Sequence, residues 1–358
     1  MKRYRFFLIV ALLMVLGILG YHNREFLFAR ETDHNVKQVE DSLPVVSNDG
    51  DSERMVSPSG EPVGIYVKTK GVMVIGVNSV EDENGVACEP CEGLLVPGDY
   101  IMRINGQLIE DKATMIEVVQ KSDGSPLLLR VCRDSEYKNI SVTPVKKRDG
   151  KYALGVWVKD DISGIGTITY TDGSRFAALG HSINDNDTGI MFQVSDGAVY
   201  ETTIIRIRKP EQQTPGRLEG VINYAGRYVL GRVEENSAYG IHGYLTKRQQ
   251  KTHENDEKVA IGQKSDVHTG KAYLLSSVSG ESKKYEIEII SVDSDNENGR
   301  CMEFKVADST LLALTGGIVQ GMSGTPILQD DRLIGAVTHV FVNDSTRGYG
   351  IFIQEMIQ

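Results

Sequence analysis

The sequence predicts a mainly β protein with two folded domains behind an N-terminal membrane segment, and three observations support this fold class. At 358 residues the chain is too long for one ordinary hydrophobic core. Over most of it, short runs rich in Val, Ile and Tyr alternate with Gly, Asn and Asp, as expected of strands joined by tight turns. One uninterrupted apolar run stands at the start.

The N-terminal run has the features of a signal anchor. Lys2, Arg3 and Arg5 precede apolar residues 6–20, a run that is short of the ~20 residues of a spanning helix but long enough for a signal sequence. Because the basic flank stays in the cytoplasm, the remainder of the chain is expected to be exported. We therefore predict a transmembrane signal anchor over residues 1–21.

An acidic stretch follows the anchor. Seven acids against two bases lie between Glu31 and Arg54, with few large apolar residues, so residues 22–60 are predicted to be a disordered linker. The net charge of −10 argues against a nucleic-acid partner.

Composition divides the rest into a small domain, 61–143, and a larger Gly-rich domain, 144–358. The small domain has strand-like runs at 71–77 and 127–131 and a helical pattern at 112–121. The larger domain consists mostly of short strands, which favours a sandwich or barrel.

Residues 93–109, GLLVPGDYIMRINGQLI, resemble the signature of PDZ domains, in which a PGD turn leads into a strand that ends at an Asn-Gly turn. PDZ domains bind an extended peptide by adding it as a strand to a sheet edge. The resemblance implies that peptide C-termini are bound, with the terminal carboxylate received by one loop and the peptide held against one helix. The residues implied are Thr69, Lys70, Gly71 and Val72 on the loop, and Met115 and Val119 on the helix.

The segment 321–326, GMSGTP, provides a candidate nucleophile. A catalytic Ser must stand on a tight turn that exposes its hydroxyl, and the glycines on both sides of Ser323 permit such a backbone. The pattern resembles the GDSGGP of chymotrypsin-like proteases, which implies an oxyanion hole made by the N–H groups of Gly321 and Ser323. Met322 replaces the family's Asp, so zymogen activation through that Asp is not expected.

His181 is the candidate general base, because it follows an apolar strand, 176–180, that ends in a glycine. His242 and His339 are alternatives. The third member of a triad is predicted to be Asp308, which follows the strand-like run 303–306 and preserves the chain order His, Asp, Ser. Its spacing from the Ser is short for chymotrypsin, and three other carboxylates stay open as alternatives: Asp185, Asp187 and Asp196.

Three segments, ALGHSI (178–183), ADSTLLALTGGIVQGMSGTPI (307–327) and THVFVND (338–344), resemble the stage IV sporulation protein B family of signalling serine peptidases. The resemblance extends from about residue 61 to the C-terminus, and in the family the triad falls on positions matching His181, Asp308 and Ser323. It implies secretion into the space between the forespore and mother-cell membranes. There the enzyme is implied to cut a membrane protein that restrains an intramembrane metalloprotease, which permits sigma-K maturation, and to cleave itself.

Two other interpretations remain. In the first, the chain is a catalytically inactive scaffold whose working part is the PDZ domain.

The second is a metal or redox role for Cys88 and Cys91, which form a CxxC. The second pair of ligands that a zinc site needs is missing. We expect no metal and no cofactor.

Overall fold

The computed structural model describes residues 54–296, 299–341 and 343–357. The chain divides into two units, Met1–Ser52 and Glu53–Gln358, and the description concerns the second. The predicted anchor and nearly all of the predicted linker therefore lie outside the described residues. Within the described ranges, no helix has the length and hydrophobicity needed to cross a membrane.

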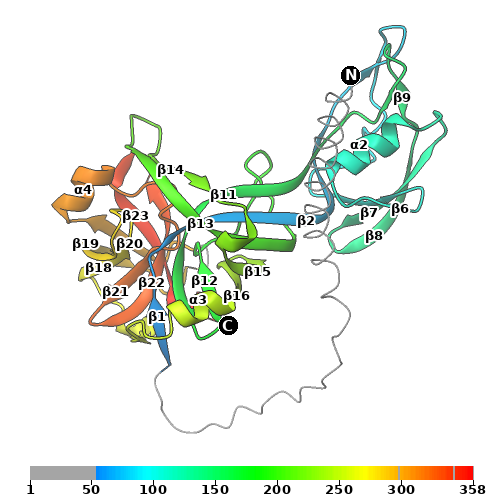
Figure 1. The fold of residues 1–358 in the computed structure, drawn as a ribbon. Coiled ribbons are helices and arrows are strands. Elements are labelled where there is room, and N and C mark those ends of the chain that lie inside the picture. Colours follow the sequence, from blue (N-terminus) through cyan, green and yellow to red (C-terminus); the bar gives the residue numbers. More distant parts are fainter. Residues whose placement is uncertain (1–53, 297–298, 342, 358) are drawn as a thin grey trace, which may run out of the picture. The chain divides into compact units, whose positions relative to one another are not determined.

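The described chain is mainly β, as predicted (Figure 1). Its first strands are β1 (Met55–Pro58), β2 (Pro62–Val77), β3 (Val80–Glu81), β4 (Ala87–Cys88), β5 (Tyr100–Ile104), β6 (Gln107–Leu108), β7 (Leu127–Arg133), β8 (Glu136–Val142), β9 (Val145–Lys146), β10 (Tyr152–Ala153), β11 (Val156–Asp172) and β12 (Arg175–Ala178). The later ones are β13 (Val194–Arg208), β14 (Arg217–Ile222), β15 (Val229–Ser237), β16 (Gly240–Leu245), β17 (Val259–Ile261), β18 (Gly270–Ser276), β19 (Lys283–Val292), β20 (Met302–Val306), β21 (Pro326–Gln329), β22 (Arg332–Phe341) and β23 (Asp344–Phe352). The helices are α2 (Lys112–Gln120), α3 (Lys247–Thr252), α4 (Ser309–Thr315) and α5 (Ile353–Met356), with 3-10 turns at Gly226–Tyr228 and Lys264–Asp266.

Six strands pair in a ring that returns to its starting strand. The order is β2, β11, β12, β16, β15, β13 and again β2, and every neighbour is antiparallel. Inward side chains of these strands, including Val63, Ile65, Phe176 and Ile241, form one hydrophobic core. We call this set of strands the first ring.

A second ring is formed by the C-terminal strands in the order β18, β19, β20, β23, β22, β21 and back to β18. It encloses a separate core that includes Tyr285, Phe304, Ile327 and Phe352. The strand β1 contacts both sheets, since it pairs with β11 and with β17.

The small domain is an insertion within the first ring. β2 and β11 are long strands that run side by side, and their paired residues extend from Pro62 with Thr167 to Val77 with Val156 (Figure 1). The ring uses the Pro62 end of this pair, whereas the other end joins β5, β7 and β8 in a sheet covered by α2. We call residues 70–158 the inserted module.

This topology corrects the predicted domain boundaries. Residues 55–58, placed at the end of the linker, form β1, and residues 62–67, placed in the small domain, carry core side chains of the first ring. In the other direction, Leu154 and Val156, placed in the larger domain, pack in the module's core. The PDZ-like segment therefore does not simply precede the larger domain, because the larger domain begins before it.

Candidate active site

Ser323 lies on a turn that leads into β21, and glycine is required on its C-terminal side. Gly324 has a φ of +93°. A Cβ there would lie 2.2 Å from the carbonyl oxygen of Thr167 and 2.5 Å from the amide nitrogen of Leu179, so no side chain fits. The same turn is tied to β11, because the N–H of Thr167 donates to the carbonyl of Ser323 at 3.0 Å.

The close approach of Gly324 to Leu179 brings the second candidate residue to the first. Leu179 and Gly180 both have positive φ values, +75° and +71°, and the chain turns sharply there at the end of β12. Positive φ is unusual for leucine and is maintained by the packing around it. His181 follows directly and lines one cavity together with Ser323. The structure thus brings these two predicted residues together.

The tautomer of His181 is defined by one hydrogen bond. Its Nδ1 lies 2.9 Å from the carbonyl oxygen of Ser182, and since a carbonyl only accepts, Nδ1 must carry the hydrogen. In the neutral ring, Nε2 is then the unprotonated nitrogen that can accept a proton. Burial lowers the pKa of His181, although the bond to Ser182 opposes that shift. The imidazole is therefore neutral near pH 7 and prepared to act as a base.

The Ser323 hydroxyl donates to the carbonyl of Thr338 at 3.1 Å rather than to His181. Two donors near it are unused: among the described residues, the N–H groups of Gly321 and Ser323 make no hydrogen bond. Gly321 has a φ of +100°, and Met322 between them is buried in the second core. The predicted oxyanion donors are therefore available to a ligand.

The cavity shared by His181 and Ser323 has a volume of about 690 Å³. Aliphatic side chains from both rings form part of its walls, namely Ile65, Ile162, Ile165, Leu179, Ile183, Pro215, Ile318, Val319, Val337 and Val340. Lys159, Asp161 and Asp185 add charged groups to the lining. Such a site suits an extended segment that presents apolar side chains to Ser323.

His339, one of the two alternatives for the base, also lines this cavity. Its ring centroid lies 5.3 Å from that of His181, and its Nδ1 is buried with no hydrogen-bond partner among the described atoms. Burial, and then the nearby His181 and Arg300, lower the pKa of His339 to about 4. The other alternative, His242, is elsewhere, where its Nε2 contacts the carbonyl of Met356.

Asp308 makes no hydrogen bond to His181 in this structure, and its role as the orienting carboxylate stays a prediction. Its carboxylate is the N-cap of α4, where Oδ1 accepts the N–H groups of Thr310 and Leu311 at 2.8 and 2.9 Å. The described structure gives it no contact with the imidazole, and it does not line the cavity. An Asp before a helix satisfies donors that have no partner in the helix, which explains its place in the sequence. The carbonyl of Ser182 instead holds His181.

The three other carboxylates also fail to reach the imidazole. Asp185 is fully buried and binds Lys159 at 2.5 Å, Asp187 binds the same ammonium at 2.7 Å, and Asp196 pairs with Arg232. Lys159 was not singled out by sequence, because a lysine within a long strand carries no local signal of a site.

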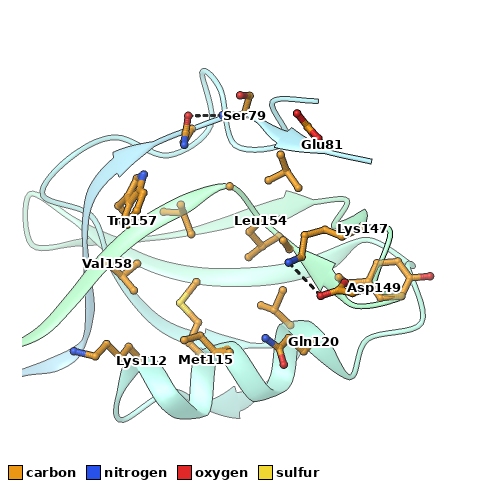
Figure 2. A pocket seen from close by; sticks show the side chains of 18 of the residues that line it. Ser79, Glu81, Lys112, Met115, Gln120, Lys147, Asp149, Leu154, Trp157 and Val158 are labelled. Atoms are coloured by element: carbon orange, nitrogen blue, oxygen red, sulfur yellow. Dashed lines mark hydrogen bonds and ion pairs between the residues drawn. The ribbon is translucent and has the colours of Figure 1, made fainter. Parts of the chain in front are cut away.

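The inserted module has its own groove, of about 910 Å³, between α2 and the start of β11 (Figure 2). Met115 of α2, Leu154, Trp157 and Val158 face it, and the predicted Val119 also lines it. Trp157 is the single tryptophan of the chain, and its large apolar side chain is 62% exposed.

The predicted loop of the peptide site is not at this groove. Thr69 is buried and donates to the carbonyls of Gly71 and Asp160, Val72 lies in the module's core, and neither they nor Lys70 line the groove. The wall facing α2 is formed instead by residues 152–158, which lie far along the chain. This corrects the prediction for Thr69, Lys70, Gly71 and Val72, whereas Met115 and Val119 are where it placed them.

The CxxC cysteines, Cys88 and Cys91, are free thiols. Burial raises the pKa of Cys91 to about 11, which keeps it protonated and unreactive near neutral pH. Within the described ranges no three His, Cys, Asp or Glu side chains gather as metal ligands would.

Comparison with known proteins gives one family match. The family model described as SpoIVB peptidase S55 matches residues 150–357. No curated protein matches the chain. Among solved structures, the PDZ domain of the SdrC-like protein from Listeria innocua is 22% identical to this chain. The match covers 25% of this chain and 92% of that PDZ domain, with a TM-score of 0.21.

Proposed function

We propose that Ser323 is the nucleophile and His181 the general base of a serine peptidase. The chain belongs to the SpoIVB peptidase S55 family. The observation that supports this assignment is their shared cavity, together with two backbone N–H groups that have no other partner. The endopeptidase activity is likewise proposed from the family membership. The two closed rings of strands support a chymotrypsin-like arrangement, with one catalytic residue from each ring.

The chemistry follows from these positions. The Ser323 hydroxyl turns from Thr338 toward Nε2 of His181, gives up its proton there, and attacks the scissile carbonyl. The negative oxygen that forms accepts hydrogen bonds from the N–H groups of Gly321 and Ser323. His181 then gives the proton to the leaving amine, and a water activated by the same nitrogen hydrolyses the acyl-enzyme. During these steps the Ser182 carbonyl keeps the ring oriented and stabilises its cation.

The biological substrate proposed is a regulatory membrane protein that restrains an intramembrane metalloprotease, whose release permits sigma-K activation during sporulation. The family membership supports this proposal. We also propose, from the family membership, that the enzyme acts in the space between forespore and mother-cell membranes, where a signal anchor holds it and self-cleavage in the linker 22–60 releases it.

Mapping of the reactive residue tests the catalytic assignment. Incubation of the purified full-length protein with a fluorophosphonate probe is expected to label one serine, Ser323, because the probe reports an activated nucleophile beside an oxyanion hole. Peptide mass spectrometry after proteolytic digestion identifies the site. An unlabelled protein that remains folded would favour the alternative function, a catalytically inactive scaffold, and labelling elsewhere would reassign the nucleophile.

The groove of the inserted module supports a second activity, PDZ-like binding of peptide C-termini. Among the described strands, none pairs with the β11 edge that faces α2 at residues 156–158, so a peptide can add there as a strand. The aliphatic and aromatic walls favour an apolar side chain at the peptide's end.

A surface change in the groove tests this activity. Ile116 lines the groove and is 49% exposed, so Ile116→Glu is expected to weaken the binding of a fluorescent peptide with an apolar C-terminus by about tenfold or more, without unfolding the module. Ile290→Glu is the matched control, because Ile290 is similarly exposed on β19. Equal anisotropy titrations for the two variants would exclude this groove as the peptide site.

A further inference from the structure

The chain that carries His181 has little regular secondary structure. Residues 181–193, which we call the His181 segment, contain no helix or strand, one bridge between Asn184 and Met191, and three backbone hydrogen bonds that close its loop. Its two ends are held by Asn236, whose side chain accepts the N–H of Ile183 and donates to the carbonyls of Ile183 and Phe192. The position of the imidazole therefore depends on side chains outside the segment as well as on the segment's own backbone hydrogen bonds.

The middle of the segment is organised by Asp185. Its Oδ1 accepts the N–H groups of Asp187 and Thr188 and the hydroxyl of Thr188, at 3.0 to 3.1 Å. Its Oδ2 receives the ammonium of Lys159 at 2.5 Å, and the same ammonium reaches Asp187. Asp185 is only four positions after His181, so this cluster decides where the segment lies.

The charge balance of the cluster rests on Lys159. Asp185 is 0% exposed, and in the described part of the chain Lys159 is the cation paired with it. Burial alone would raise the pKa of Asp185, but the hydrogen bonds from Lys159 and Thr188 lower it overall. A buried carboxylate that loses its partner is strongly destabilised, and it regains stability by protonation or by moving toward water. Either response would disturb the His181 segment.

We infer that Lys159 is a positioning residue for His181, acting through its ion pair with the buried Asp185. Lys159 lies on β11, whose later residues bind the Ser323 turn through Thr167, so one strand contacts the surroundings of both Ser323 and His181. Lys159 itself has no contact with Ser323 or His181. The inference rests on the proposed function, because it assigns a task within the same site.

The competing role for Lys159 is contact with an acidic group of the substrate, since it also lines the cavity. The two roles differ in their dependence on Asp185. A positioning lysine becomes dispensable once the buried charge is removed, because an asparagine at 185 retains an oxygen for the segment's N–H groups. A substrate-binding lysine stays necessary whatever stands at residue 185.

The test measures the rate of fluorophosphonate labelling at Ser323 in full-length variants. Lys159→Met is expected to slow labelling by about 10- to 100-fold, the loss that displacement of a catalytic group by about 1 Å produces. The double variant Lys159→Met/Asp185→Asn is expected to label within about fivefold of wild type, and Lys159→Arg to retain most of the rate. Arg133→Met is the control, because it breaks a comparable pair with the fully buried Asp99 in the module.

The outcomes separate the inference from the proposed function. Labelling of Lys159→Met at the wild-type rate, or a double variant as slow as Lys159→Met, would overturn the positioning role. If circular dichroism shows that Lys159→Met does not fold, the double variant and Lys159→Arg still test the positioning role. A folded double variant that labels slowly would contradict that role. Failure of wild type to label at all would instead reject the assignment of Ser323.

Discussion

Replacing Ser323 by alanine is expected to abolish proteolysis while leaving the fold intact. The hydroxyl is the atom that attacks, so the variant should lose about 10³- to 10⁶-fold in kcat, as when the nucleophile of a serine protease is removed. In the ground state this hydroxyl makes one hydrogen bond among the described residues, to the backbone carbonyl of Thr338, and its loss costs only about 1 kcal/mol. Ser345→Ala is the matched control, because that hydroxyl also donates to a carbonyl, of Gly316.

The same variant tests self-processing. Wild-type protein is expected to acquire a new N-terminus between residues 22 and 60, whereas Ser323→Ala produced alone should keep the intact chain. N-terminal sequencing of both proteins measures this difference. Trimming of the Ser323→Ala chain at the wild-type position would show that another protease performs the cut.

That Ser323 and His181 lie at one site could be predicted from sequence, because the backbone around each residue is set by its neighbours along the chain. Gly321 and Gly324 have the positive φ values that the sequence pattern requires, and Gly180 precedes His181 in the same way. For Asp308, spacing along the chain cannot distinguish an orienting carboxylate from a helix cap, and in the structure its carboxylate caps α4. The helix cap could have been predicted from sequence, since Asp followed by Ser and Thr before an apolar run is a common helix start.

The boundary of the inserted module could not be predicted from composition. β2 continues without a break from the core of the first ring, at Val63 and Val67, to the core of the module, at Val72 and Val74. A long strand shared by two cores shows the same apolar alternation throughout, so no local change marks the junction. The groove wall formed by residues 152–158 was also not predicted, because these residues lie far from α2 in the sequence.

Substitution of His181 is expected to have an effect of similar size to that of Ser323→Ala. His181→Gln removes the proton acceptor, so kcat/KM for peptide cleavage should fall by about 10³-fold or more, with the residual rate due to the oxyanion donors and binding. The ring makes only one hydrogen bond, to its neighbour Ser182, so the variant should fold normally.

The pH dependence of the wild-type enzyme gives the same assignment a second readout. The neutral imidazole is the active form, and burial lowers the pKa of His181 below its ordinary value of 6.5. The acidic limb of the kcat/KM profile should therefore lie below pH 6.5, so that activity persists through pH 6.5 and falls only at lower pH. A limb at or above pH 6.5 would contradict the buried neutral base.

Asp308→Asn is the decisive companion to His181→Gln. Asparagine caps helices about as well as aspartate, so this variant should keep the cap of α4, the melting temperature and the acidic limb, with kcat within about twofold of wild type. An orienting triad carboxylate behaves differently, since its replacement by the amide costs about 10⁴-fold in kcat by favouring the wrong tautomer. A large loss of kcat in folded Asp308→Asn would therefore mean that α4 moves when substrate binds and delivers Asp308 to His181. Retained activity would leave the Ser182 carbonyl as the group that orients the base.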